Sequence, residues 1–130
     1  MKIDEDMEML NDLTSKIIKA AMKVHSALGP GLLESAYELC LEYELKKMGL
    51  KVERQKTLPV EYEGVFIDAG YRIDLLIEDL VIIELKAVER LQPIHHAQLL
   101  SYLRLAKKKI GLLINFHEVH LRDGIVRKAN

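Results

Sequence analysis

The chain has 130 residues, of which 49% are hydrophobic and 30% charged, a composition that is typical of one globular domain and excludes a disordered chain. A formal net charge of −1 excludes a global positive field, so any nucleic-acid contact must come from a local patch. The single cysteine, Cys40, excludes an internal disulfide and a cysteine-rich zinc site. No apolar stretch approaches ~18 residues and the N-terminus is acidic, so we expect no membrane segment or signal peptide, and a cytoplasmic location.

The first part of the chain is predicted to form two helices. Residues 1–10 are acidic and are predicted to be a loose lead-in. Apolar residues recur at helical spacing over residues 11–28, and the sequence GPG at residues 29–31 ends this helix. A second helix is predicted over residues 32–48, with Gly49 as its C-terminal stop.

The rest of the chain alternates between strand-like and helical patterns. The predicted elements, in chain order, are an outer strand (51–64), the two strands of a central hairpin (65–77 and 80–88), a helix (95–109), a short buried strand (110–116) and a terminal hairpin (119–128). This order, together with the absence of repeats and linkers, predicts one α/β domain over residues 11–130.

Each strand of the central hairpin has one apolar face and one face that carries its charges, because alternate side chains of a strand share a face. The apolar faces comprise Ile73, Leu75 and Ile77 on the first strand and Val81, Ile83 and Leu85 on the second. The opposite faces carry Arg72 and Asp74 on the first strand and Glu84 and Lys86 on the second.

The register of the hairpin decides whether Asp74 and Glu84 meet. A two-residue loop at residues 78–79 would pair Asp74 with Ile83 and mix charged with apolar side chains, which is disfavoured where one face is buried. An odd loop or a bulge pairs Asp74 directly with Glu84, with Cβ atoms about 5 Å apart. The hydrophobic pattern therefore predicts that the two carboxylates are neighbours.

Two adjacent carboxylates repel each other, so one must take a proton or both must share a cation. Oxygen ligands on a rigid sheet suit Mg²⁺, Mn²⁺ or Ca²⁺. Lys86 projects to the same side, where it could orient a water molecule or stabilise charge on a phosphate. Spacing alone leaves open the alternative of a structural ion-pair cluster of Arg72, Asp74, Glu84 and Lys86.

The central hairpin resembles the core signature of the PD-(D/E)xK nuclease superfamily, in which an acid, here Asp74, is followed on the next strand by (D/E)-x-K, here residues 84–86. Ile73 stands where that signature usually has proline. The sequence LGPGLLESAYE, with Gly31, Glu34 and Tyr37, resembles the GxxExxY family, a nuclease-like group within the superfamily. The resemblance continues through ERQ, YRIDLLIEDLVIIELKAVERL, HAQLLSYLRL and GLLINF, and so covers nearly the whole chain.

The resemblance implies a restriction-endonuclease-like αβββαβ core, a mixed sheet flanked by helices, with an extra N-terminal helix and a small C-terminal hairpin. It implies that Asp74 and Glu84 are metal ligands, joined by the backbone carbonyl of Leu85, and that Lys86 positions the attacking water. Glu34 matches the N-terminal acid of the superfamily and would complete the metal shell directly or through water.

Four further residues are candidates for the site. Tyr37 lies three residues after Glu34 on the same helix face, where substrate contact and a buried core role both remain open. Gln98 and Tyr102 match the QxxxY pattern of the family, and Gln98 would act in catalysis by binding a phosphate or the site lysine, or would only satisfy buried polar atoms. Arg72 is expected to add positive charge for substrate binding.

The leading expectation is a metal-dependent nuclease that uses Mg²⁺ or Mn²⁺ to hydrolyse phosphodiester bonds, with DNA favoured over RNA as the substrate. The alternative is a catalytically silent module that keeps the nuclease fold and binds nucleic acid or a protein partner. A third interpretation is a phosphodiesterase that acts on a small nucleotide. A small domain offers little surface for a duplex, so a homo-oligomer or a partner protein could supply the rest.

Overall fold

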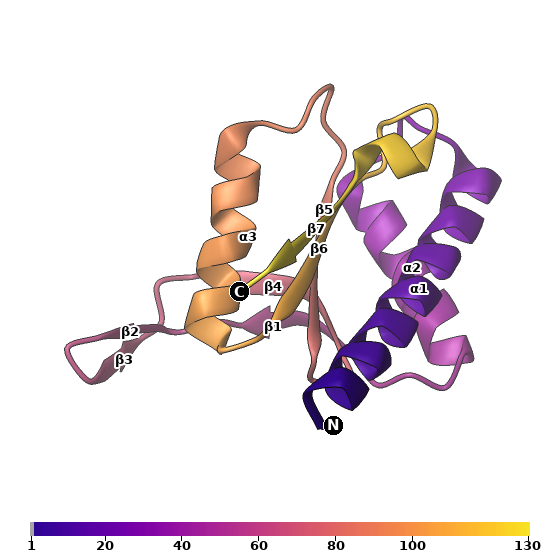
Figure 1. The fold of residues 1–130 in the computed structure, drawn as a ribbon. Helices are drawn as coiled ribbons and strands as arrows, with labels where there is room; N and C mark the ends of the chain where they lie inside the picture. Colours follow the sequence, from indigo (N-terminus) through magenta and orange to yellow (C-terminus); the bar gives the residue numbers. More distant parts are fainter. Residues whose placement is uncertain (1) are drawn as a thin grey trace.

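The computed structural model describes the backbone of residues 2–130 and the side chains of residues 5–130, and it has three layers. A five-stranded mixed sheet lies between two helices on one face and a third helix on the other (Figure 1). The helices are α1 (Lys2–Leu28), α2 (Glu34–Lys47) and α3 (Pro93–Ala106), with a short 3₁₀ helix, η1 (Leu121–Gly124). Among residues 2–130, no helix is both long and apolar enough to cross a lipid bilayer.

The sheet has the strand order β1-β4-β5-β6-β7. Its strands are β1 (Val52–Thr57), β4 (Arg72–Ile77), β5 (Val81–Lys86), β6 (Ile110–Asn115) and β7 (Ile125–Ala129). All neighbouring strands are antiparallel except β5 and β6, which are parallel and are joined through α3. The order α2, β1, β4, β5, α3, β6 is the expected αβββαβ core, and α1 is the expected extra helix.

The structure departs from the sequence predictions at both ends of the chain. The segment predicted as a loose lead-in is helical from Lys2 onward, because acidic residues suit a helix N-terminus and Leu10 continues the apolar stripe of α1. A C-terminal hairpin is present, but its strands are β6 and β7. Asp123 and Gly124 lie in η1 instead of at a two-residue turn, and Gly124 packs closely against Asn115.

The register of β4 and β5 is the one that the hydrophobic pattern predicted. Leu76 pairs with Ile82, and the loop between the strands has three residues, 78–80. Glu78 and Asp79 adopt left-handed conformations, with φ of 54° and 57°, which allows this tight odd-numbered turn.

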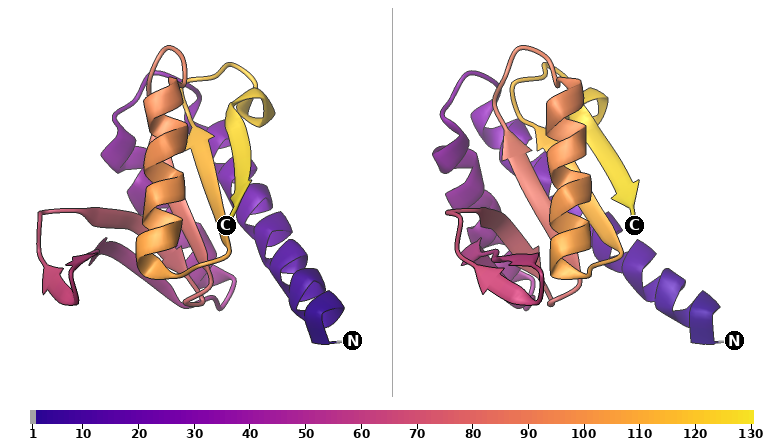
Figure 2. Two further views of the ribbon diagram at one scale, coloured as in Figure 1. Left: turned by 60° about the vertical axis from the view of Figure 1, so that its left-hand side comes forward. Right: turned by 90° about the vertical axis from the view of Figure 1, so that its left-hand side faces the viewer.

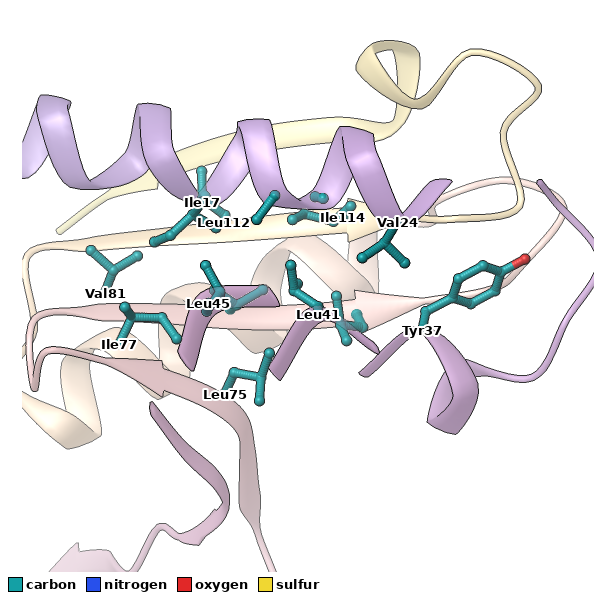
Figure 3. Close-up of a cluster of buried hydrophobic side chains, with 14 of the residues drawn as sticks. Ile17, Val24, Tyr37, Leu41, Leu45, Leu75, Ile77, Val81, Leu112 and Ile114 are labelled. Carbon is teal, nitrogen blue, oxygen red and sulfur yellow. The ribbon is translucent and has the colours of Figure 1, made fainter. Parts of the chain in front are cut away.

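The apolar face of this hairpin packs against α1 and α2 in the larger core (Figure 3). The residues labelled there are Ile17, Val24, Tyr37, Leu41, Leu45, Leu75, Ile77, Val81, Leu112 and Ile114. A smaller core lies under α3, where Leu99 and Leu103 cover Leu76 and Ile82. Ile73 belongs to this smaller core and not, as predicted, to the face of Leu75, because the alternation of β4 is interrupted at Asp74, which lies opposite the left-handed Gln55 and is not paired with it.

Gly111 on β6 lets α3 approach the sheet closely. A Cβ atom at this position would lie 2.7 Å from Leu99 Cδ1, which is closer than packed carbon atoms allow. The small residue therefore sets the height of α3 above the strands that carry the charged residues.

Strands β2 (Val60–Tyr62) and β3 (Val65–Ile67) form a separate hairpin between β1 and β4. Together with their flanks they make up the arm, residues 59–70, which projects from the three layers (Figures 1 and 2). Side chains such as Tyr62 and Phe66 are exposed on the arm, and its ends meet where the Leu58 N–H donates to the Tyr71 carbonyl.

Candidate functional site

The paired carboxylates lie where β4 and β5 separate. The last backbone pair of the hairpin is Leu75 with Ile83. Beyond it, the Asp74 backbone N–H donates to Glu84 Oε2 at 2.9 Å, and the Leu85 backbone N–H donates to Asp74 Oδ2 at 2.8 Å. The two carboxylates thus replace main-chain hydrogen bonds, in a position that we call the fork (Asp74, Glu84 and Leu85).

The fork holds acids whose ionised forms are disfavoured. Burial, followed by the charge of Asp74, raises the pKa of Glu84 to about 8, and the side chain is only 4% exposed. Burial also raises the pKa of Asp74, while the Leu85 N–H and Lys86 act in the opposite direction. Without a cation, burial and mutual repulsion therefore favour a proton within the pair.

Lys86 is half-buried at the end of β5, and its charge lowers the pKa of both fork acids. Arg72 instead pairs with Asp68, at 3.4 Å from Nη1 to Oδ1. Within residues 5–130, no ion pair joins Arg72 or Lys86 to Asp74 or Glu84. The predicted alternative of a four-membered ion-pair cluster on a solvated face is therefore not what the chain forms.

A third carboxylate reaches the fork from α2, and it belongs to Glu38. Its side chain is 6% exposed, and its pKa is raised by burial and then by the charge of Asp74. Glu34, which the sequence pattern assigned to this position, is exposed at the first residue of α2 and makes no described hydrogen bond. The acid of α2 that lies beside Asp74 is therefore Glu38, one helical turn after Glu34.

Two neighbouring residues of β1 contact Glu38, and one of them, Gln55, also contacts the fork. Gln55 Nε2 donates to Glu38 Oε1 at 2.8 Å and to Asp74 Oδ1 at 3.3 Å. Arg54 Nη1 lies 3.2 Å from Glu38 Oε2. Both contacts lower the pKa of Glu38, against the effect of its burial.

Helix α3 supplies the other wall of the site. Gln98 Nε2 donates to Tyr102 Oη at 3.0 Å, so the two residues of the QxxxY pattern contact each other. Burial raises the pKa of Tyr102, and the charges of Glu84 and Asp74 raise it further, which places the phenol near the fork. Tyr71, at the base of the arm, packs edge-on against Tyr102 with ring centroids 5.9 Å apart.

Comparison with protein families agrees with this geometry. A family model described as the PD-(D/E)XK nuclease superfamily matches residues 11–128. The chain belongs to the PD-(D/E)XK nuclease superfamily. Its mixed sheet flanked by helices is the restriction-endonuclease-like fold of that superfamily, whose nucleases generally use divalent metal ions and act on nucleic acid. Comparison with curated proteins and with solved structures gives no match.

The donor chemistry of the fork fits the divalent ion that PD-(D/E)XK nucleases use, although the side chains do not converge on one point. Asp74, Glu84 and Glu38 supply only oxygen atoms, and all three carboxyls have raised pKa values that a cation would reverse. In the described part of the chain, no group of three or more His, Cys, Asp or Glu side chains is arranged to hold a metal ion. Gln55 donates to both Glu38 and Asp74, and the Leu85 N–H donates to Asp74.

Tyr37 has a structural role in the fold. Its side chain is fully buried, and its ring stacks on Phe116 with centroids 4.6 Å apart. Its hydroxyl donates to the Gly29 carbonyl. The same hydroxyl accepts from the Leu32 N–H at 3.0 Å. Of the two roles that the sequence left open, this geometry corresponds to the core role, because the hydroxyl is used to close the GPG turn.

The apolar spacing of α2 marks Glu38 as a buried residue, although the GxxExxY motif points to Glu34. Leu41 and Leu45 follow Glu38 at the helical spacings of three and seven residues, and all three side chains are buried. A charged residue on the core stripe of a helix is unusual unless it is paired or functional.

Asn115 was also missed, although it is the polar residue in the otherwise apolar strand β6. It is fully buried, and its Nδ2 donates to the Val88 carbonyl at 2.8 Å while its Oδ1 accepts from the Val88 N–H at 3.1 Å. The chain that follows Lys86 is thereby fixed against β6, where the Phe116 N–H also donates to the Lys86 carbonyl at 2.8 Å.

Proposed function

We propose that the protein is a metal-dependent nuclease that hydrolyses phosphodiester bonds in DNA, with Mg²⁺ or Mn²⁺ held at the fork. The observation that carries this proposal is the pairing of Asp74 with Glu84, a half-buried and a buried acid whose pKa values are both raised, which favours either a proton or a cation between them. A buried acid pair with no cation costs stability, and a divalent ion bound there would offset that cost.

The ligands would be Asp74, Glu84 and the backbone carbonyl of Leu85, with Glu38 in the position first assigned to Glu34. The N–H and C=O of one residue in an extended strand point to the same edge. Since the Leu85 N–H donates to Asp74, its carbonyl is directed toward β4 as well. A divalent ion held there would polarise a phosphoryl oxygen and lower the pKa of a bound water.

Lys86 would hold the attacking water or the non-bridging phosphate oxygens. Its ammonium group stands beside the fork without an ion-pair partner in the described residues, so its donors are free for this task. Gln98 and Tyr102 form the wall of α3 and would contact the substrate backbone. Arg72 lies two residues before Asp74 and would add positive charge at the edge of the site.

We further assign the chain to the GxxExxY group within the superfamily, on the spacing of Gly31, Glu34 and Tyr37. The role of Tyr37 in closing the turn at Gly29 gives a physical reason for part of that motif. The turn sets where α2 begins, and therefore where Glu38 meets the fork.

A second candidate function is supported by one observation. In the part of the chain that the structure describes, the carboxylates of Glu38, Asp74 and Glu84 do not converge as a metal shell. This arrangement favours a catalytically silent module that keeps the nuclease fold and binds nucleic acid.

Cleavage of single-stranded, double-stranded and branched DNA in the presence of Mn²⁺ or Mg²⁺ separates the two functions. We expect the wild-type protein to cut at least one of these, and Lys86→Ala to lower the rate by about 10²- to 10⁴-fold while binding Mn²⁺ as tightly. Lys47→Ala, which removes the same charge from an exposed position on α2, is the matched control. Cleavage by Lys86→Ala at the wild-type rate would contradict the assigned role, and intact DNA with saturating metal would favour the silent module.

A further inference from the structure

The backbone of Gln55 is left-handed in the middle of a β-strand, with φ of 54°. Its neighbours pair normally with β4, Arg54 with Leu75 and Lys56 with Ile73, so Gln55 stands level with Asp74. Side chains with a Cβ atom adopt this conformation at a cost, and residues held in it gather at functional sites.

The left-handed residue changes which side chains can meet. In a regular strand, Arg54 and Gln55 would point to opposite faces of the sheet. Here both donate to the carboxylate of Glu38, Arg54 to Oε2 at 3.2 Å and Gln55 to Oε1 at 2.8 Å. The unusual backbone is therefore what directs the Gln55 amide toward the site and not away from it.

The amide of Gln55 joins two acids that would otherwise repel each other. A primary amide carries two N–H donors on one nitrogen and no charge. Nε2 of Gln55 uses them on Glu38 Oε1 and on Asp74 Oδ1, at 2.8 Å and 3.3 Å. Each carboxylate oxygen has a second lone pair, so these hydrogen bonds leave acceptor sites for a cation.

We propose that Gln55 is a positioning residue that holds Glu38 and Asp74 together as metal ligands. The inference rests on the proposed function, because it assumes that a divalent ion binds at the fork. Donors that orient metal-ligating carboxylates commonly contribute 10- to 100-fold to metal affinity. Gln55 is such a donor for two ligands that come from different elements, α2 and β4.

The test is calorimetric titration of Mn²⁺ into the wild-type protein and three variants. Gln55→Gly removes the amide but favours the left-handed backbone, so these two effects on stability oppose each other and the variant should still fold, which its melting temperature without metal checks. We expect its Mn²⁺ affinity to fall about 10- to 100-fold. Gln55→Asn keeps an amide and tolerates the same backbone, so it should bind Mn²⁺ more tightly than Gln55→Gly.

Lys107→Gly is the control, because Lys107 is also left-handed, with φ of 57°, and lies at the C-terminus of α3. We expect this variant to bind Mn²⁺ as the wild type does. Wild-type affinity in Gln55→Gly, or weaker binding by Gln55→Asn than by Gln55→Gly, would overturn the role of Gln55 alone. A wild-type protein that binds no Mn²⁺ would contradict the proposed function and this inference with it.

Discussion

At the level of single residues, the fork depends on the protonation state of Glu84. Its pKa of about 8 in the folded chain lies far above the ordinary value of 4.5, because the carboxyl is buried beside Asp74. The folded state therefore binds more protons than the unfolded state between these two values, and stability is lost as the pH rises through this window.

This difference predicts a measurable pH dependence in the metal-free protein. The free energy of unfolding should decrease from about pH 4.5 to pH 8, with a slope of at most about 1.4 kcal/mol per pH unit from one proton. Glu84→Gln keeps the shape of the side chain and removes its titration, so the slope should become shallower. Urea denaturation with a chelator present, from pH 5 to pH 9, measures both.

Glu61→Gln is a suitable comparison, since Glu61 is exposed on the arm and lies outside both cores. It should keep the wild-type slope. Equal slopes in Glu84→Gln and the wild type would mean that Glu84 does not titrate as a buried acid.

Some residues of the site could be placed from the sequence alone, and others could not. The pairing of Asp74 with Glu84 followed from alternation, because a one-residue slip would have buried charges among Leu75 and Ile83. Glu38 could not be placed by the same means, since the contact depends on where α2 crosses the sheet. Gln55 lies in the ERQ segment of the resemblance, but nothing in that local pattern indicates a left-handed glutamine within a strand.

At the level of elements, the site is assembled from both faces of the sheet. Helix α2 brings Glu38 from one side, α3 brings Gln98 and Tyr102 from the other, and the fork lies between them. The elements were predictable because their apolar periods are clear. The contacts between these elements were not predictable, since the distance between α3 and the sheet depends on Gly111, which packs under Leu99.

The arm is an element that the folded core does not need. Its side chains from residues 61–70 are exposed and belong to neither hydrophobic core. Its ends are already joined by the hydrogen bond of 3.0 Å from the Leu58 N–H to the Tyr71 carbonyl. Replacing residues 60–70 with a short glycine-containing turn should therefore change the free energy of unfolding by less than about 1 kcal/mol.

Chemical denaturation measures this change, with Leu45→Ala as a reference for core damage. Leu45 lies on the buried face of α2 and is 0% exposed, and its truncation should cost about 2 to 5 kcal/mol. A loss of that size on removing the arm would show that the arm stabilises the three layers.

At the level of the whole molecule, a chain with a net charge of −1 is proposed to act on a polyanion. The carboxylates of the fork would repel a phosphate backbone, so a bound cation is required before substrate can approach. The fold and the superfamily were predictable from the sequence, because the apolar pattern and the motifs agree over almost the whole chain. The positions of Glu38 and Gln55 beside the fork were not, since both reach it only through the tertiary arrangement of α2 and β1.

The central claim is that Asp74 and Glu84 hold a divalent cation. Crystals soaked in Mn²⁺ test it directly, because the anomalous signal of manganese locates the ion without reference to any assumed site. We expect a manganese peak in the fork, in contact with carboxylate oxygens of Asp74 and Glu84 and absent from Asp74→Asn crystals soaked in the same way. An empty fork at saturating Mn²⁺, or the same peak in the variant, would contradict it.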